Sequence, residues 1–386
     1  MKFSRLALLS LALVVAAASR AASQSPDRGI EHFAGFDYIL ASDIKWNSTT
    51  GAFTVPQRFR AVRAGTELNA DSGFGNSRKK LLHATGHVIV HQGKQFGTGA
   101  DAAKVTQEPS TLTCDKLDAD GTRKYYVATG AVHYTQIDRD MTSNSGTLDD
   151  ANHMLHLEGS VHIRDKGQYV DADVVDYNTQ TGQVNVHGSP AVVRVPAEPP
   201  AAAGVDNIQA ADIAWNMSSG EYNVPGRFTA VRSGSEISAD SGLGNTKAKT
   251  LHATGNVIVH QNKQFGTGTD AAKVTQEPST LTCDKLDVDG ANKLYIATGN
   301  VHFTQTNRDM RSKSGVLDDA KHLLHLEGDV HIRDKEQLYD ADTVDYNTQS
   351  GETDIRGRPA MIRVPVQSPA PAAPKPRATK KPKKGS

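Results

Sequence analysis

The chain has 386 residues, and its 43 basic and 43 acidic side chains leave no formal net charge. This balance gives no sign of the strongly basic surface on which nucleic-acid binding depends. Aromatic residues make up only 6% of the chain while glycine occurs 33 times, which indicates many turns. The two cysteines are too few for a disulfide framework, so stability must come from noncovalent packing.

The N-terminal segment, residues 1–23, has the layout of a secretory signal peptide. Lys2 and Arg5 come before a run, Leu6–Ala18, that is apolar except for Ser10, and small residues follow it. A helix that spans a bilayer needs about 20 apolar residues, so this shorter run favours a cleaved signal over a retained anchor. We therefore expect an exported protein.

Most of the remaining chain is one module written twice. Residues 35–196 recur as residues 204–365 with a constant offset of 169, no gap and 109 identical positions out of 162. A module repeated in this way indicates a protein that works through an extended surface rather than through one solitary active site.

Within each module the pattern has a period of two residues, which is typical of strands with one covered face. In TGHVIVHQ (85–92) the side chains of Val88 and Val90 share one face, opposite those of Ile89 and the histidines. Similar segments follow along the module and recur in its second copy. The apolar sides of these strands supply the candidate groove residues: Val88, Val90, Val132, Tyr134, Val161 and Ile163, then Val257, Val259, Val301, Phe303, Val330 and Ile332.

Glycines occur at regular places next to these segments. Gly86, Gly130 and Gly159 each come directly before a strand, and we expect them to form tight corners between strands. Ala70-Asp71 and Ala172-Asp173 are expected to be turns, because an aspartate can bond its own backbone. Many short strands at regular spacing predict an all-β sandwich, barrel or solenoid, and the fine repeat favours stacked strand pairs.

Two further segments lie outside the modules. Residues 197–203 are predicted to be a short linker rich in proline and alanine, which leaves open whether the modules stack or fold separately. Residues 366–386 are rich in proline and lysine and are predicted to be disordered. This basic tail could tether the protein to an anionic surface or simply keep it soluble.

The segment YVDADVVDYNTQTGQVNVHG (169–188) and its second copy (338–357) resemble the LptA/OstA-like family. Its pattern is an Ala-Asp step, a turn, and then Gly-Asn-Val at the start of a strand, as in Gly255-Asn256-Val257. The first copy departs from it, with His87 and Ala131 in place of the asparagine.

The resemblance implies an all-β fold of two tandem open β-jelly rolls in a periplasmic protein. Such a protein holds the acyl chains of lipopolysaccharide or a related glycolipid in an apolar groove and helps to carry it to the outer membrane. The implied partners are that lipid and other β-jelly-roll transport proteins at the inner and outer membranes. The resemblance implies no cofactor and no enzymatic activity.

No set of residues in the sequence predicts a catalytic or metal site. His153 and His156 recur as His322 and His325, but strand positions three apart point to opposite faces, whereas zinc needs three or four converging ligands. Paired aspartates such as Asp149-Asp150 are expected to form turns. Cys114 and Cys283 occupy the same place in each module and are expected to be small buried residues. We expect no disulfide between them, because end-to-end stacking would keep equivalent sites of the two modules apart.

The sequence offers two alternatives to lipid transport. Edge strands at the ends of a stack invite pairing with a second copy, so the chain could be a scaffolding protein of the envelope that assembles through its sheet edges. An enzyme on a β-helix would need a convergent set of acidic and basic side chains, which neither module provides.

Overall fold

The structure is a computed structural model that describes residues 38–63, 65–96, 105–195, 207–232, 235–262, 264–265 and 274–364. These residues form strands, turns and connecting segments without any helix, so they contain no helix that could cross a membrane. The fold is all-β, as predicted. The predicted signal peptide (1–23), linker (197–203) and basic tail (366–386) lie outside the described residues.

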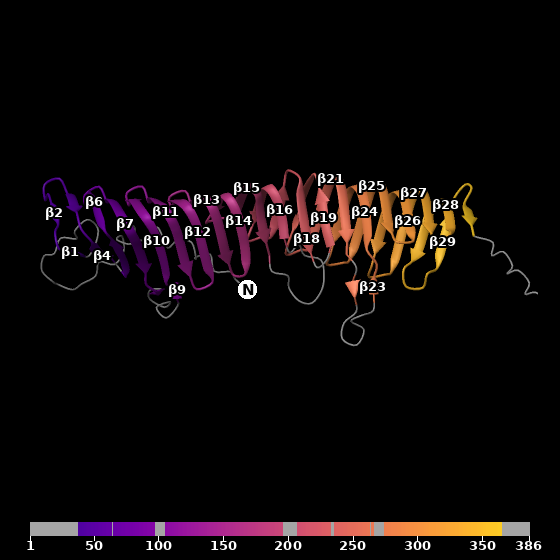
Figure 1. The fold of residues 1–386 in the computed structure, drawn as a ribbon, viewed down its shortest axis with the longest axis horizontal. Coiled ribbons are helices and arrows are strands. Elements are labelled where there is room, and N and C mark those ends of the chain that lie inside the picture. The colour runs from indigo at the N-terminus through magenta and orange to yellow at the C-terminus, as the bar shows by residue number, and fades with distance from the viewer. Residues whose placement is uncertain are drawn as a thin grey trace, which may run out of the picture.

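Twenty-six of the strands form a single antiparallel sheet that runs the length of the molecule (Figure 1). In the first repeat these are β1 (Tyr38–Ala41), β2 (Lys45–Trp46), β3 (Ala52–Val55), β4 (Phe59–Arg63), β5 (Thr66–Ala70), β6 (Ser72–Asn76), β7 (Leu81–Gln92), β10 (Ser110–Asp120), β11 (Tyr125–Gln136), β12 (Arg139–Asp149), β13 (Met154–Asp165), β14 (Gln168–Asn178) and β15 (Gln183–Arg194).

In the second repeat they are β16 (Asn207–Asn216), β17 (Glu221–Val224), β18 (Phe228–Arg232), β19 (Ser235–Ala239), β20 (Ser241–Asn245), β21 (Thr250–Gln261), β24 (Ser279–Asp289), β25 (Leu294–Gln305), β26 (Arg308–Asp318), β27 (Leu323–Asp334), β28 (Gln337–Asn347), β29 (Thr353–Arg356) and β30 (Met361–Arg363). Two small hairpins stand apart from this sheet: β8 (Gln95–Phe96) with β9 (Val105–Gln107), and β22 (Gln264–Phe265) with β23 (Val274–Gln276). Figure 1 shows β9 and β23 on the same side of the molecule.

Each long strand bends sharply near its middle, which gives the sheet two arms. In β7 the bend falls at Gly86 and His87, both with positive φ (76° and 44°). The Leu81–Thr85 half of β7 pairs with β6, whereas its other half pairs with β5. We call the arm that contains β2, β3 and β6 the first arm, and the arm that contains β1, β4 and β5 the second arm.

The glycines therefore lie within strands and not between them, which corrects the expectation from the sequence. Gly130 and Gly159 occupy the same kind of bend in β11 and β13. Asn256 and Asn300 follow the corresponding glycines with φ of 45° and 48°. Asparagine tolerates this left-handed conformation better than most residues, which explains the Gly-Asn step physically.

Ala70-Asp71 and Ala172-Asp173 both lie at the level of these bends, the first where the chain passes from β5 to β6 and the second within β14. Asp71 lies between β5 and β6, and its carboxylate accepts a hydrogen bond from His87 Nδ1 at 2.6 Å. In the second repeat Asn256 Nδ2 donates to Asp240 at 2.7 Å. Ala172-Asp173 lies in the middle of β14. The acidic side chains thus connect the bends of neighbouring strands.

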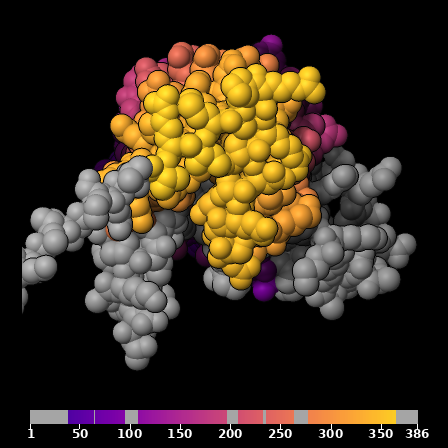
Figure 2. All heavy atoms as spheres, turned by 90° about the vertical axis from the view of Figure 1, so that its right-hand side faces the viewer, coloured from indigo at the N-terminus to yellow at the C-terminus, as the bar shows by residue number. Residues whose placement is uncertain are grey.

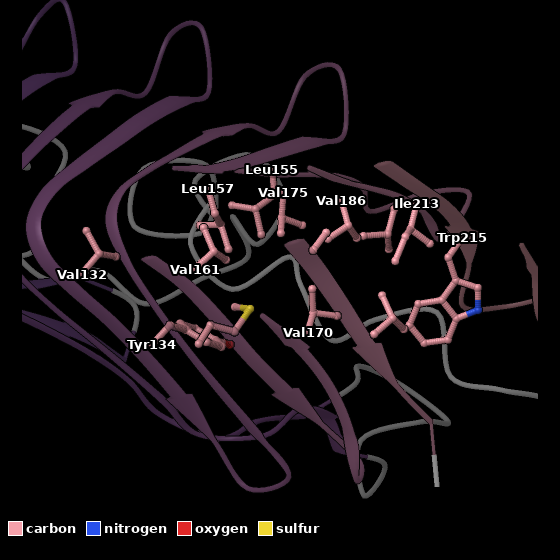
Figure 3. Packing of buried hydrophobic residues seen from close by; sticks show 14 of the residues in the cluster. Val132, Tyr134, Leu155, Leu157, Val161, Val170, Val175, Val186, Ile213 and Trp215 are labelled. Atoms are coloured by element: carbon pink, nitrogen blue, oxygen red, sulfur yellow. The ribbon is translucent and has the colours of Figure 1, made fainter. Parts of the chain in front are cut away.

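The two repeats share one uninterrupted sheet. β15 pairs with β16 from Gln183↔Asn216 to Arg194↔Asn207, which answers the question that the linker sequence left open. Buried side chains form a continuous layer across this joint, from Val132 to Trp215 (Figure 3). Ile213 and Trp215, on β16, are only 1% and 2% exposed.

The strands at the two ends of the sheet are the repeat counterparts of the two strands that form the joint. β1 and β2 correspond to β16, and β29 and β30 correspond to β15. Trp46, the counterpart of Trp215, is 48% exposed. At the other end β29 and β30 pair only with β28 among the described strands. Figure 2 looks along the molecule from this end.

Candidate functional site

An elongated cavity of about 830 Å³ lies between the two arms of the second repeat. Strands from β17 to β28 contribute to its walls. The second arm supplies Val259, Leu281 and Phe303, and the first arm faces them with Leu286 and Leu317. The walls are mainly aliphatic and aromatic because every second residue of a strand points to the same side of the sheet.

The first repeat has a smaller cavity of about 40 Å³ at the corresponding place. All ten residues around it have counterparts in the wall of the larger cavity, and nine of the ten pairs are identical. The exception is Tyr134, which corresponds to Phe303. Both repeats therefore present the same apolar lining.

The structure places eleven of the twelve predicted groove residues in or against the core, and the twelfth, Phe303, is partly buried in the wall of the larger cavity. Val88, Val161, Val257 and Val330 are fully buried beside the bends. Val90 is 4% exposed, and Ile163 and Ile332 are partly buried against the core. The residues that line a cavity are Val132 and Tyr134 in the first repeat, and Val259, Val301 and Phe303 in the second.

Several wall residues had no place in the sequence prediction. Met310, Ser312, Gly315 and Leu317 lie on β26, where the serine and glycine interrupt the apolar alternation. Gly315 occupies a confined place, since a Cβ there would lie 3.1 Å from Leu326 Cδ2. The limited space near the bend therefore explains why a small residue occupies position 315. Their signal in the sequence was the identical pattern Ser-x-Ser-Gly in both modules.

Polar side chains lie at the borders of the cavity. Lys249 and Asp319 line it on the first-arm side, together with Tyr346. Arg308, on the second arm, also lines it, and its Nη2 lies 2.8 Å from Asp334 Oδ2. An apolar interior bordered by charged groups suits a ligand that is itself amphipathic.

The histidines do not converge on a metal site. No group of three or more His, Cys, Asp or Glu side chains that could hold a metal ion occurs in the described part of the chain. Most described histidines instead contact one aspartate on a neighbouring strand, as His156 does with Asp176 at 2.7 Å and His162 with Asp171 at 2.8 Å. These contacts connect adjacent strands.

The cysteines are buried and free, as expected from the sequence. Burial, assisted by the nearby Asp115, raises the pKa of the Cys114 thiol to about 12. Burial and Asp284 raise the pKa of Cys283 to about 11. Because the thiolate is the reactive form, neither side chain is suited to act as a nucleophile near neutral pH.

Comparison with known proteins identifies the family. No match was found among curated protein sequences. The solved structures that match part of this chain include LptH, described as the LptA homologous periplasmic component of the conserved lipopolysaccharide transport device from Pseudomonas aeruginosa. That alignment covers 42% of this chain and 90% of LptH, with 10% identity and a TM-score of 0.24. A family described as "LptA/(LptD N-terminal domain) LPS transport protein" matches twice, at residues 67–183 and 236–352. These two matches, one in each repeat, cover more than half of the chain, which therefore belongs to the LptA/LptD N-terminal domain family of LPS transport proteins.

Proposed function

We propose that the protein binds lipopolysaccharide or a related glycolipid between the arms of its sheet and helps to carry it across the periplasm to the outer membrane. The supporting observation is the apolar cavity of about 830 Å³ in a chain of this family. Residues 1–23 would direct the export. Other β-jelly-roll transport proteins at the two membranes would deliver and receive the lipid.

The energetics of such binding come from burial of acyl chains. Each CH₂ group removed from water contributes about 0.8 kcal/mol, so a few acyl chains suffice for tight binding. The side chains that would contact them are Val259, Val301 and Phe303, together with Leu281 and Leu317. No covalent step is required, so we propose a carrier and not an enzyme.

A pair of neighbouring residues on β21 tests this proposal. Val259 lines the cavity, whereas Ile258 belongs to the opposite face of the same strand. Val259→Asp should reduce binding of purified lipopolysaccharide at least tenfold, because a carboxylate would stand where acyl chains pack. Ile258→Asp should bind as the unaltered protein does. Equal binding by both variants would refute the cavity as the binding site.

Native mass spectrometry would identify the cargo. Protein purified gently from its own host should carry lipid of glycolipid mass, which extraction would then identify. Protein that is free of lipid and also refuses added lipopolysaccharide would contradict the proposal.

A second candidate function is a scaffold that assembles end to end, and the two ends of the sheet favour it. Within the chain His187 faces Asp212 across the joint, with a 2.6 Å contact. The counterparts of this pair at the free ends are Arg356 and Asp43. Asn185 and Ala214, also partners at the joint, correspond to Asp354 and Lys45. A second copy added in the register of β15 and β16 would therefore bring two opposite-charge pairs together.

Charge reversal tests this assembly. Scattering should show that particle length grows with protein concentration, and Lys45→Glu or Asp354→Lys should each suppress the growth. The double variant, which exchanges the two charges, should restore it, because the pair is again of opposite sign. Growth that is insensitive to all three variants would show that any association uses another surface.

A further inference from the structure

Arg308 is a charged side chain at the border of the cavity between the arms, on the arm opposite to Lys249 and Asp319. Arg308 is the first residue of β26 and lines the cavity on the second arm, two residues before Met310. Its register partner on β27 is Asp334, and the two side chains form an ion pair at 2.8 Å. Both side chains are about one-third exposed, at 30% and 32%. Asp334 thus holds the guanidinium at the border of the cavity.

Arg308 also contacts a residue of the opposite arm. Tyr346 lies on the first-arm half of β28, where it pairs with Leu324. Asp334, by contrast, pairs with Gln337 at the far end of the other half. The Arg308 Cζ atom nevertheless lies 5.5 Å from the centre of the Tyr346 ring, which is a cation–π contact. This contact, which we call the rim contact, crosses from one arm to the other.

The rim contact lies far from the bend where the two arms meet. The arms diverge from the bend at Gly328 and Asp329, and Asp334 ends its strand five residues further on. At about 3.3 Å per residue this arm extends roughly 16 Å from the bend. A contact between the two arms at that distance from the bend spans the open side of the space between them at β26 and β28.

The first repeat contains the same three residues in the same places. Arg139 Nη2 lies 2.6 Å from Asp165 Oδ2, and Tyr177 is the counterpart of Tyr346. Tyr177 lies within the electrostatic influence of both charges: burial raises its pKa, Arg139 opposes this and Asp165 adds to it. The ion pair and the tyrosine are therefore present in both modules.

We propose that the rim contact between Arg308 and Tyr346 limits sideways entry of a ligand into the cavity. We call this reversible steric barrier the bar. A cation–π contact is weak enough to open reversibly, while Asp334 keeps the arginine in place for closure. A ligand then enters either along the stack from an end or sideways when the bar opens. This inference rests on the proposed lipid-binding function for its biological meaning, but not for its test.

The test compares Tyr346→Leu with two controls. Leucine fills similar space without an aromatic face, Tyr346→Phe keeps that face, and Arg311→Gln removes an exposed arginine of the same strand. The first readout needs no lipid: a cysteine placed in the cavity wall by Leu317→Cys is labelled with a bulky maleimide dye. Tyr346→Leu should raise the labelling rate about three- to tenfold, which is the range expected for loss of a contact of this class. Arg311→Gln should label at the original rate, and Tyr346→Phe should label more slowly than Tyr346→Leu.

The second readout is stopped-flow binding of fluorescently labelled lipopolysaccharide. Tyr346→Leu should raise both the association rate and the dissociation rate. Unchanged labelling and unchanged rates in Tyr346→Leu would overturn the bar. If the protein binds no lipopolysaccharide but labelling still responds to Tyr346→Leu, the proposed function fails while the bar stands.

Discussion

At the scale of single residues, the bends depend on glycines that no other residue can replace at equal stability. Gly130 has φ of 78°, and a Cβ at this position would collide with the side chain of Asp115. Gly65 has a similar φ of 81°, but nothing lies within 4 Å of the place of its Cβ. Substituting alanine at Gly65 would therefore cost only backbone strain, whereas at Gly130 it would cost backbone strain and a collision.

We expect Gly130→Ala to lower the free energy of unfolding by about 2–4 kcal/mol and Gly65→Ala by about 1 kcal/mol. Denaturant titrations followed by circular dichroism measure both values. Similar losses in the two variants would mean that the contact with Asp115 does not contribute.

His87 makes a bend sensitive to pH. Its hydrogen bond to Asp71 and the charge of that carboxylate raise the pKa of the imidazole above its usual value near 6.5. The resulting stabilisation is therefore fully present below pH 6.5 and is lost as pH rises through the higher pKa of the folded state. An NMR titration should find the His87 pKa above 6.5, and lower in Asp71→Asn.

The second repeat supplies the control for this effect. Asn256 takes the place of His87 and makes the same contact without a titrating group. His87→Asn should therefore keep the bend but lose its pH dependence. A His87 pKa at or below 6.5 in the unaltered protein would contradict this account.

At the scale of strands, alternation along the sequence predicted the all-β class and the inward face of each segment. It succeeded because the side-chain period of a strand is a local property. Val132 and Phe303 were placed correctly on the inner face for this reason. The position of the glycines was predicted wrongly. A glycine appears in the sequence both where a positive φ occurs within a bent strand and where it occurs between two strands, so the sequence does not distinguish them.

Other parts of the site could not be predicted in this way. Arg308 and Tyr346 are 38 positions apart and lie on different arms, so their contact depends on how far the arms open. The pairing of β15 with β16 depends on which strands become neighbours across the linker. Both are long-range outcomes of packing and carry no local pattern.

At the scale of the whole molecule, the joint should make the two repeats unfold as coupled units. Ile213 is 1% exposed within the joint, whereas its counterpart Ile44 at the free end is 37% exposed. Ile213→Ala should cost about 2–4 kcal/mol and separate thermal unfolding into two steps, while Ile44→Ala should cost less than about 1 kcal/mol. Calorimetry distinguishes these outcomes. A single unchanged transition in Ile213→Ala would show that the joint contributes little to coupling.

The order of strand pairing has a consequence for how the chain acquires its structure. From β10 to β16 each strand pairs with the one that follows it in sequence, as it does again from β24 to β28. Loops that join such neighbours close at little entropic cost, so folding need not wait for distant segments. A chain that emerges N-terminus first could add strands one after another onto those already formed. The completed first repeat, through β15, would then serve as the surface on which the second repeat begins to fold.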